Sequence, residues 1–154
     1  SADVEHDVRA VVADVYARGG GIVTGGALGV DYIATDEALK HDPAAARLKI
    51  ILPTSLSDYA SHYFKRAAEG VISQKQAEDL TAQLGAVRAA NPAALVEMHY
   101  TVCTPKTYYA RNTAVLDAAD QLAAFQVNGS AGTQDTIDKA RARGMAVTHK
   151  TYGI

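Results

Sequence analysis

The chain has 154 residues, of which 48% are hydrophobic and 21% charged, and its formal net charge is -2 at pH 7. This composition is typical of one globular domain with a single core and excludes an intrinsically disordered chain. The slightly acidic balance also excludes a molecule-wide basic field that would hold nucleic acid non-specifically.

The cysteine content and the lack of a long apolar run bear on where the protein works. The lone Cys103 cannot form an internal disulfide, which favours a reducing compartment. No apolar stretch reaches the roughly 18 residues that span a bilayer, and the sequence from Ser1 onward is not typical of a signal peptide. We therefore expect a cytoplasmic protein with no membrane partner.

Apolar spacing predicts alternating helices and strands in the first part of the chain. Val4, Val8 and Val15 share one face at helical spacing, and a run of glycines ends that helix. Short β-branched runs bounded by glycine or proline predict strands. In chain order, we expect a helix over 3–18, a strand over 22–24, a helix over 30–40, a buried strand over 48–53, and a helix through Tyr63 and Ala67 that Thr54 or Ser57 caps.

The same two patterns continue in the second part of the chain. Leu80, Leu84 and Val87 mark one stripe of a helix, and Asn91 and Pro92 follow its end. In chain order, we expect a helix over 73–90, a strand over 95–98, a helix over 108–119, a strand over 121–126, a helix over 134–143 and a strand over 145–148.

This alternation predicts an α/β fold. Apolar strands separated by helices indicate a three-layer, Rossmann-like arrangement, with an open, mainly parallel sheet and helices on both faces. We interpret residues 1–154 as a single domain. In such a sheet the first helix normally follows a strand, and here the first predicted element is a helix. We therefore expect that an N-terminal strand, and part of the site with it, is missing from this sequence.

Two Gly-rich turns each follow a short apolar strand and open a helix. Their candidate ligand-binding residues are Thr24, Gly25, Gly26, Ala27, Gly29 and Asp31 in loop 1 (residues 24–31), and Asn128, Gly129, Ser130, Gly132 and Thr133 in loop 2 (residues 128–133). Glycine lets the backbone turn sharply and leaves N–H groups free for an anion. Because parallel strands end at one rim, we predict that the loops form opposite walls of one phosphate- or nucleotide-binding crevice.

Each candidate residue also has a simpler interpretation. Loop 1 has the spacing of neither a dinucleotide-binding fingerprint nor a Walker A loop, and each of the two loops could be a tight turn without a ligand. Asp31 could accept a hydrogen bond from a ribose hydroxyl, or its charge could simply stabilise the positive end of the helix dipole. Arg111, with Asn112 beside it, could pair with phosphate through two hydrogen bonds or form a surface salt bridge.

The chain resembles the SLOG superfamily, which includes DNA-processing protein A and the lonely guy enzymes. The resemblance rests on residues 22–31 with Ala34, on residues 109–112 and 119–120, and on loop 2. It implies a Rossmann-like domain that binds nucleotides or their derivatives and forms homo-oligomers. The residues at matching positions are Gly25, Gly26, Arg111, Gly129, Ser130, Gly132 and Thr133.

The sequence departs from the lonely guy pattern at the position of the catalytic glutamate. Those enzymes cleave a base from a nucleoside monophosphate with an arginine and a glutamate, and the glutamate position is Thr136 here. Asp135 is adjacent, but neighbours on a helix differ by about 100° around its axis. This departure argues against glycosidic chemistry. The Gly-Ser-Arg element that opens proteins like DNA-processing protein A is also absent.

The histidines, the cysteine and the tyrosines are weaker candidates for functional residues than the two loops. The five histidines lack metal-ligand spacing, so we predict no metal site. Cys103 could pair with His99 as a nucleophile or fill apolar space. Tyr100, Tyr108 and Tyr109 could stack on a base, or pack within the fold or an oligomer contact.

Three functions follow, in order of preference. The first is a protein that binds a nucleotide or nucleotide derivative without an assured catalytic centre. The second is a hydrolase or transferase acting on the N-glycosidic bond of a nucleotide, with Asp31, Glu37 or Glu97 in place of the missing glutamate. The third is a single-stranded DNA-binding protein, against which the acidic balance counts.

Overall fold

The computed structural model describes residues 1–154 and contains the predicted elements in the predicted order. The helices are α1 (Ala2–Ala17), α2 (Val30–His41), α3 (Leu56–Ala68), α4 (Gln74–Ala90), the 3-10 turn η1 (Pro92–Ala94), α5 (Pro105–Asp117) and α6 (Ala131–Ala142). The strands are β1 (Ile22–Thr24), β2 (Leu48–Thr54), β3 (Leu95–Tyr100), β4 (Gln121–Val127) and β5 (Ala146–Tyr152). No helix is long and apolar enough to cross a membrane.

The capping residues of three helices, α3, α5 and α6, differ from the expectation or were not recognised from the sequence. The cap of α3 is Ser55, whose side chain accepts a hydrogen bond from the backbone of Asp58, rather than Thr54 or Ser57. Helix α5 starts earlier than expected because Thr104 and Thr107 form a reciprocal capping box, with proline at the first helical position. Ser130 likewise starts α6 within loop 2.

All strand pairs are parallel, which confirms the open Rossmann-like α/β fold. Strand β2 lies between β1 and β3 in a three-stranded sheet, with Ile22 opposite Leu48 and Ile50 opposite Leu95. Strands β4 and β5 form a separate two-stranded sheet. The sheet is therefore divided, and a cavity of about 730 Å³ lies between β1 and β4.

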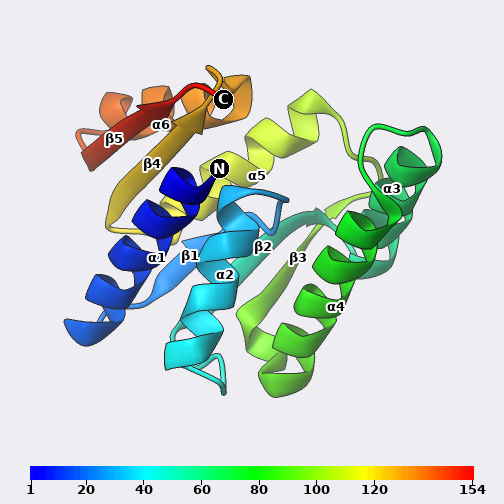
Figure 1. The fold of residues 1–154 in the computed structure, drawn as a ribbon, viewed down its shortest axis with the longest axis horizontal. Helices are drawn as coiled ribbons and strands as arrows, with labels where there is room; N and C mark the ends of the chain where they lie inside the picture. Colours follow the sequence, from blue (N-terminus) through cyan, green and yellow to red (C-terminus); the bar gives the residue numbers. More distant parts are fainter.

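The core lies around β2 and the helices that cover it. Ile50 and Leu52 of β2 are fully buried with Leu84 of α4, and Val8 of α1 belongs to the same cluster. Helix α1 packs against α2, and α5 packs against α6 (Figure 1). This packing fixes the ends of β1 and β4, from which the two Gly-rich loops emerge.

Candidate functional site

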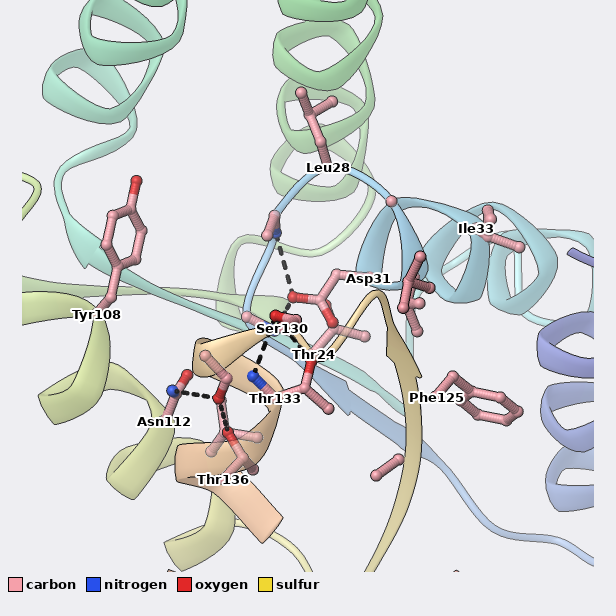
Figure 2. Close-up of a pocket in the computed structure, with 18 of the residues that line it drawn as sticks. Thr24, Leu28, Asp31, Ile33, Tyr108, Asn112, Phe125, Ser130, Thr133 and Thr136 are labelled. Carbon is pink, nitrogen blue, oxygen red and sulfur yellow. Dashed lines mark hydrogen bonds between the residues drawn. The ribbon is translucent and has the colours of Figure 1, made fainter. Parts of the chain in front are cut away.

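The two Gly-rich loops meet at one cavity. Most of the predicted site residues line it: Thr24, Gly25, Ala27, Gly29, Asp31, Arg111, Asn112, Ser130, Gly132 and Thr133 (Figure 2). Gly26, Asn128 and Gly129 do not line the cavity. Loops far apart in the sequence thus form walls of one space, at the carboxyl ends of β1 and β4, where ligands bind in open α/β sheets.

Helix α5 joins the two loops through neighbouring side chains. Arg111 donates a hydrogen bond from Nη1 to the carbonyl of Gly25 in loop 1. Asn112 donates from Nδ2 to the carbonyl of Gly132 in loop 2, at 3.4 Å. Because these side chains extend from one helix, they set the separation of the two walls.

Contrary to the expectation, the first amides of loop 1, those of Gly25, Gly26 and Ala27, are not free. One carboxylate oxygen of Asp31, Oδ2, accepts hydrogen bonds from the backbone N–H of Gly25 at 3.1 Å and of Ala27 at 3.2 Å. Gly26 donates its N–H to the hydroxyl of Thr24 at 3.4 Å. The protein's own negative charge therefore occupies the position that an anion would take in loop 1.

Packing requires two of the glycines of loop 1, Gly25 and Gly26. A Cβ at Gly25 would lie 2.6 Å from Cζ of Arg111. A Cβ at Gly26 would lie 2.6 Å from Cδ2 of Leu52, and Gly26 has a φ of +68°, which side chains rarely adopt. Gly25 thus admits the arginine, whereas Gly26 lets the loop lie on the core.

Loop 2 leaves its helix terminus open. The backbone amides of Ala131 and Gly132 at the start of α6 have no partner within the protein, and the first turn holds no acidic residue. The hydroxyls of Ser130 and Thr133 lie beside these amides on the cavity. Free amides at a helix N-terminus attract anions, so this wall can bind a phosphate.

The turn that precedes α6 is hydrogen-bonded to the C-terminal end of the chain. The side chain of Asn128 accepts a hydrogen bond from the amide of Ile154 at 2.9 Å. Asn128 and Gly129 both have positive φ, at 51° and 66°. These two residues shape the turn, and Ser130, Gly132 and Thr133 present donor groups at the cavity.

Arg111 is the buried cation of the site. The residue is 6% exposed and its side chain forms no ion pair within 4.0 Å of a carboxylate, so the surface salt bridge considered from the sequence is wrong. Besides the Gly25 carbonyl it contacts Oδ1 of Asn112 at 3.2 Å, and its Cζ lies 5.3 Å from the ring centre of Tyr108. A buried guanidinium without a carboxylate is costly unless an anion joins it.

Tyrosines form a wall beside Arg111. Tyr63 and Tyr108 line the cavity, and burial raises the pKa of both, although Arg111 acts in the opposite direction. Tyr59 beneath them donates to the carbonyl of Gly26 at 3.0 Å and lies 3.3 Å from the hydroxyl of Tyr63. Sequence analysis missed Tyr63 because its helical spacing indicated only packing.

Of the other aromatic and thiol candidates, only Tyr109 lines the cavity. Tyr109 lines the cavity at its exposed edge, whereas Tyr100 stacks against His99 with ring centres 4.7 Å apart. Burial raises the pKa of the Cys103 thiol, which disfavours the thiolate. His99 faces an aromatic ring, so the structure does not favour the Cys103 nucleophile.

The three candidate acids lie in different parts of the molecule. Glu37 is hydrogen-bonded to His41 at 2.8 Å and to Arg9. Glu97 accepts the backbone N–H of Leu56 at 2.6 Å. Neither lines the cavity, so Asp31 is the acid among the three that could face a ligand there.

The residues around the missing glutamate position occupy different surfaces. Thr136 lines the cavity and donates its hydroxyl to the carbonyl of Gly132 at 3.1 Å. Asp135 is turned to α5, where it accepts from Asn112 and pairs with Lys139 at 2.9 Å. No group of three His, Cys, Asp or Glu side chains is placed to hold a metal ion.

The fold is similar to that of a solved structure over nearly the whole of this chain. DNA processing protein A from Helicobacter pylori, a structure described for its single-stranded DNA binding mode, aligns with 97% of this chain at a TM-score of 0.66 and 18% sequence identity. The fold is that of DNA processing protein A. The chain spans 59% of the length of that protein. No family model matches the chain, and no curated protein matches its sequence.

Proposed function

We propose that the protein binds a nucleotide or nucleotide derivative and holds its phosphate between Arg111 and the N-terminus of α6. The observation that carries this proposal is the buried, carboxylate-free Arg111 on the cavity whose other wall has unpaired amides at Ala131 and Gly132. A phosphate oxygen can accept from a guanidinium and from helix amides at once. Such an anion would balance the buried charge.

Loop 1 takes a different role in this proposal. The carboxylate of Asp31 already holds the amides of Gly25 and Ala27, so it repels phosphate toward loop 2. Its other oxygen, Oδ1, has no hydrogen-bond partner within the protein and can accept a ribose hydroxyl. Tyr63 and Tyr108 offer aromatic faces for the base.

Two further functions remain as alternatives. Cleavage or transfer at an N-glycosidic bond of a nucleotide is supported by the position of Asp31 on the cavity, although Thr136 replaces the expected glutamate. Single-stranded DNA binding is supported by the shared fold with DNA processing protein A. The net charge of -2 disfavours an extended polyanion relative to a single nucleotide.

One set of binding measurements separates these functions. Calorimetry compares adenosine monophosphate with adenosine, and chromatography of the same samples detects free adenine. A labelled oligothymidine is titrated at several salt concentrations, and light scattering reports the self-association that the SLOG resemblance implies.

The proposal predicts that the monophosphate binds at least about 10-fold more tightly than the nucleoside, because only the phosphate reaches Arg111 and α6. The nucleotide stays intact. Equal affinity for the two ligands would contradict the proposal. Release of adenine would favour the glycosidic alternative, and tight, salt-sensitive oligonucleotide binding without monophosphate binding would favour the DNA-binding alternative.

A further inference from the structure

A buried glutamine on strand β4 contacts loop 2 from outside the cavity. Gln126 is 5% exposed and does not line the cavity. Its amide nitrogen, Nε2, donates one hydrogen bond to the carbonyl of Ser130 at 3.0 Å and another to Oε1 of Gln134 at 3.1 Å. Burying an amide is costly unless its polar groups are paired. Here the nitrogen has two acceptors, and one of them belongs to the loop that carries the proposed phosphate site.

The oxygen of the same amide is held from strand β5. Oε1 of Gln126 lies 2.8 Å from Nε2 of His149. Because an amide oxygen can only accept, this imidazole nitrogen carries the hydrogen. An amide turned by 180° would place its oxygen against the Ser130 carbonyl, which also only accepts. These contacts therefore fix one orientation of the Gln126 amide, with its nitrogen toward loop 2.

The hydrogen bonds continue from Gln126 to a carboxylate on α6. Gln134 donates from Nε2 to Oδ1 of Asp138 at 2.8 Å, and its own oxygen accepts from Gln126. All donors thus point one way, from His149 through the two glutamines to Asp138. Hydrogen bonds that run in one direction polarise one another, which strengthens the network as a whole. Loop 2 is therefore attached to a network that joins β4, β5 and α6.

The hydrogen bond to Ser130 determines where the next amide points. In a planar, trans peptide unit, the C=O of one residue and the N–H of the next point in opposite directions. The Ser130 carbonyl accepts from Gln126 and from the backbone N–H of Gln134, 3.0 Å away in the first turn of α6. The N–H of Ala131 consequently points away from Gln126. Ser130 and Gly132, on either side of Ala131, both line the cavity.

We propose that Gln126 is a positioning residue for the phosphate: by holding the Ser130 carbonyl on the buried side of loop 2, it keeps the amide of Ala131 turned toward the cavity. The inference rests on the proposed function, since this amide is one of the two unpaired donors assigned to the phosphate there. Without Gln126, only the Gln134 amide would hold the carbonyl, and terminal turns of helices fray. A side chain on β4 ties this terminal turn to the sheet.

The test replaces the amide with an apolar side chain of similar length. Gln126→Met removes the donors and the acceptor while filling similar space. Gln83→Met is the matched control, because Gln83 is also buried, at 9% exposed, and donates from Nε2 to the backbone carbonyl of Tyr32 at 3.0 Å. Neither Gln83 nor Tyr32 lines the cavity. Thermal denaturation checks that both variants fold, and each should lower Tm by about 4 °C.

The binding measurement compares two ligands that differ only in the phosphate. In Gln126→Met, adenosine monophosphate should bind about 5- to 10-fold more weakly than in the unchanged protein, because a donor to the phosphate is no longer held in place. The affinity for adenosine should stay within about 2-fold, since only the phosphate is assigned to loop 2. A merely structural role would weaken both ligands alike. Gln83→Met should leave both affinities unchanged.

A second variant tests the orientation of the amide and keeps Gln126 in place. His149→Phe removes the hydrogen that Oε1 accepts, at a half-buried position that should tolerate the change even if Gln126→Met does not fold. We expect this variant to bind adenosine monophosphate about 3-fold more weakly. Hydrogen exchange needs no ligand. The amide of Gln134 should exchange about 10-fold faster in Gln126→Met and at an unchanged rate in Gln83→Met.

These results separate the positioning role from the proposed function. A loss confined to the monophosphate in Gln126→Met, with faster exchange at Gln134, supports the positioning role. Equal losses for both ligands, the same monophosphate loss in Gln83→Met, or unchanged monophosphate affinity in whichever of Gln126→Met and His149→Phe folds would overturn it. The proposed function would then still stand, because the unchanged protein prefers the monophosphate. If the unchanged protein binds both ligands equally, the proposed function fails and the positioning role fails with it.

Discussion

Loop 1 and loop 2 are similar in composition but differ in what they offer a ligand. Both are rich in glycine, follow a strand and begin a helix. In loop 1 the amides of Gly25 and Ala27 bind the carboxylate of Asp31. In loop 2 the amides of Ala131 and Gly132 remain unpaired. The helix that follows loop 1 thus supplies a carboxylate to the turn before it, whereas the first turn of the helix after loop 2 holds no acidic residue.

The two loops also differ in what lies beneath them. The position of a Cβ at Gly26 is blocked by Leu52 and Ile50, whereas nothing lies within 4 Å of a Cβ at Gly129 or Gly132. The turn of loop 1 at Gly26 therefore packs directly on the core. Loop 2 lies over open space, so its residues are free to serve binding.

The largest expected effect tests the packing difference between the loops. Gly26→Ala should lower the free energy of unfolding by about 3 kcal/mol, because a methyl group adds overpacking to the strain of positive φ. Gly129→Ala has nearly the same φ, at +66° against +68°, but open space around it, and should cost about 1 kcal/mol. Urea denaturation measures both. Equal losses would show that packing does not distinguish the loops.

The next effect tests the arginine that touches loop 1 and faces the cavity. Arg111→Ala should weaken adenosine monophosphate binding about 10- to 100-fold, because a charge-assisted hydrogen bond is lost. The affinity of Arg111→Lys for adenosine monophosphate should lie between those of the unchanged protein and Arg111→Ala, because lysine keeps the charge but lacks the planar guanidinium. Arg143→Ala is the control, because this arginine pairs with Asp117 outside the cavity. Calorimetry is paired with urea denaturation, and unchanged affinity in folded Arg111→Ala would remove this residue from the site.

A smaller effect tests the carboxylate that closes loop 1. Asp31→Asn should strengthen inorganic phosphate binding about 5-fold, because a like charge near the phosphate is removed. Asp135→Asn makes the same change in net charge, but Asp135 faces Asn112 and Lys139 outside the cavity lining. Its effect should be smaller. Equal gains in equilibrium dialysis would mean that net charge, and not the position of Asp31, sets the affinity.

The smallest effect tests the helix terminus of loop 2. Ser130→Ala removes a cavity hydroxyl and a weak cap to the amide of Thr133 at 3.5 Å, so phosphate binding should weaken about 3-fold. The free energy of unfolding should fall by about 0.5 to 1 kcal/mol. Ser55→Ala removes the corresponding cap of α3 and should reduce stability without changing phosphate binding. If both variants bind phosphate equally, the Ser130 hydroxyl has no part in the site.

The sequence by itself determined the elements and their order. The strand over 22–24 has the predicted limits, and Ser73 starts α4 with a capping box, because both depend on residues close together in the chain. The start of α5 was misplaced since Pro105 and the Thr104 cap lie outside its apolar period. Periodicity also predicted helices on both faces of a parallel sheet.

Only the tertiary structure decided which groups of the site are free. Whether Arg111 is buried depends on Gly25, 86 residues away, and whether loop 2 faces loop 1 depends on Asn112 of α5. The division of the sheet between β1 and β4 is equally non-local. Hydrophobic period and capping are properties of neighbouring residues, whereas charge pairing and enclosure depend on segments that meet only when the chain folds.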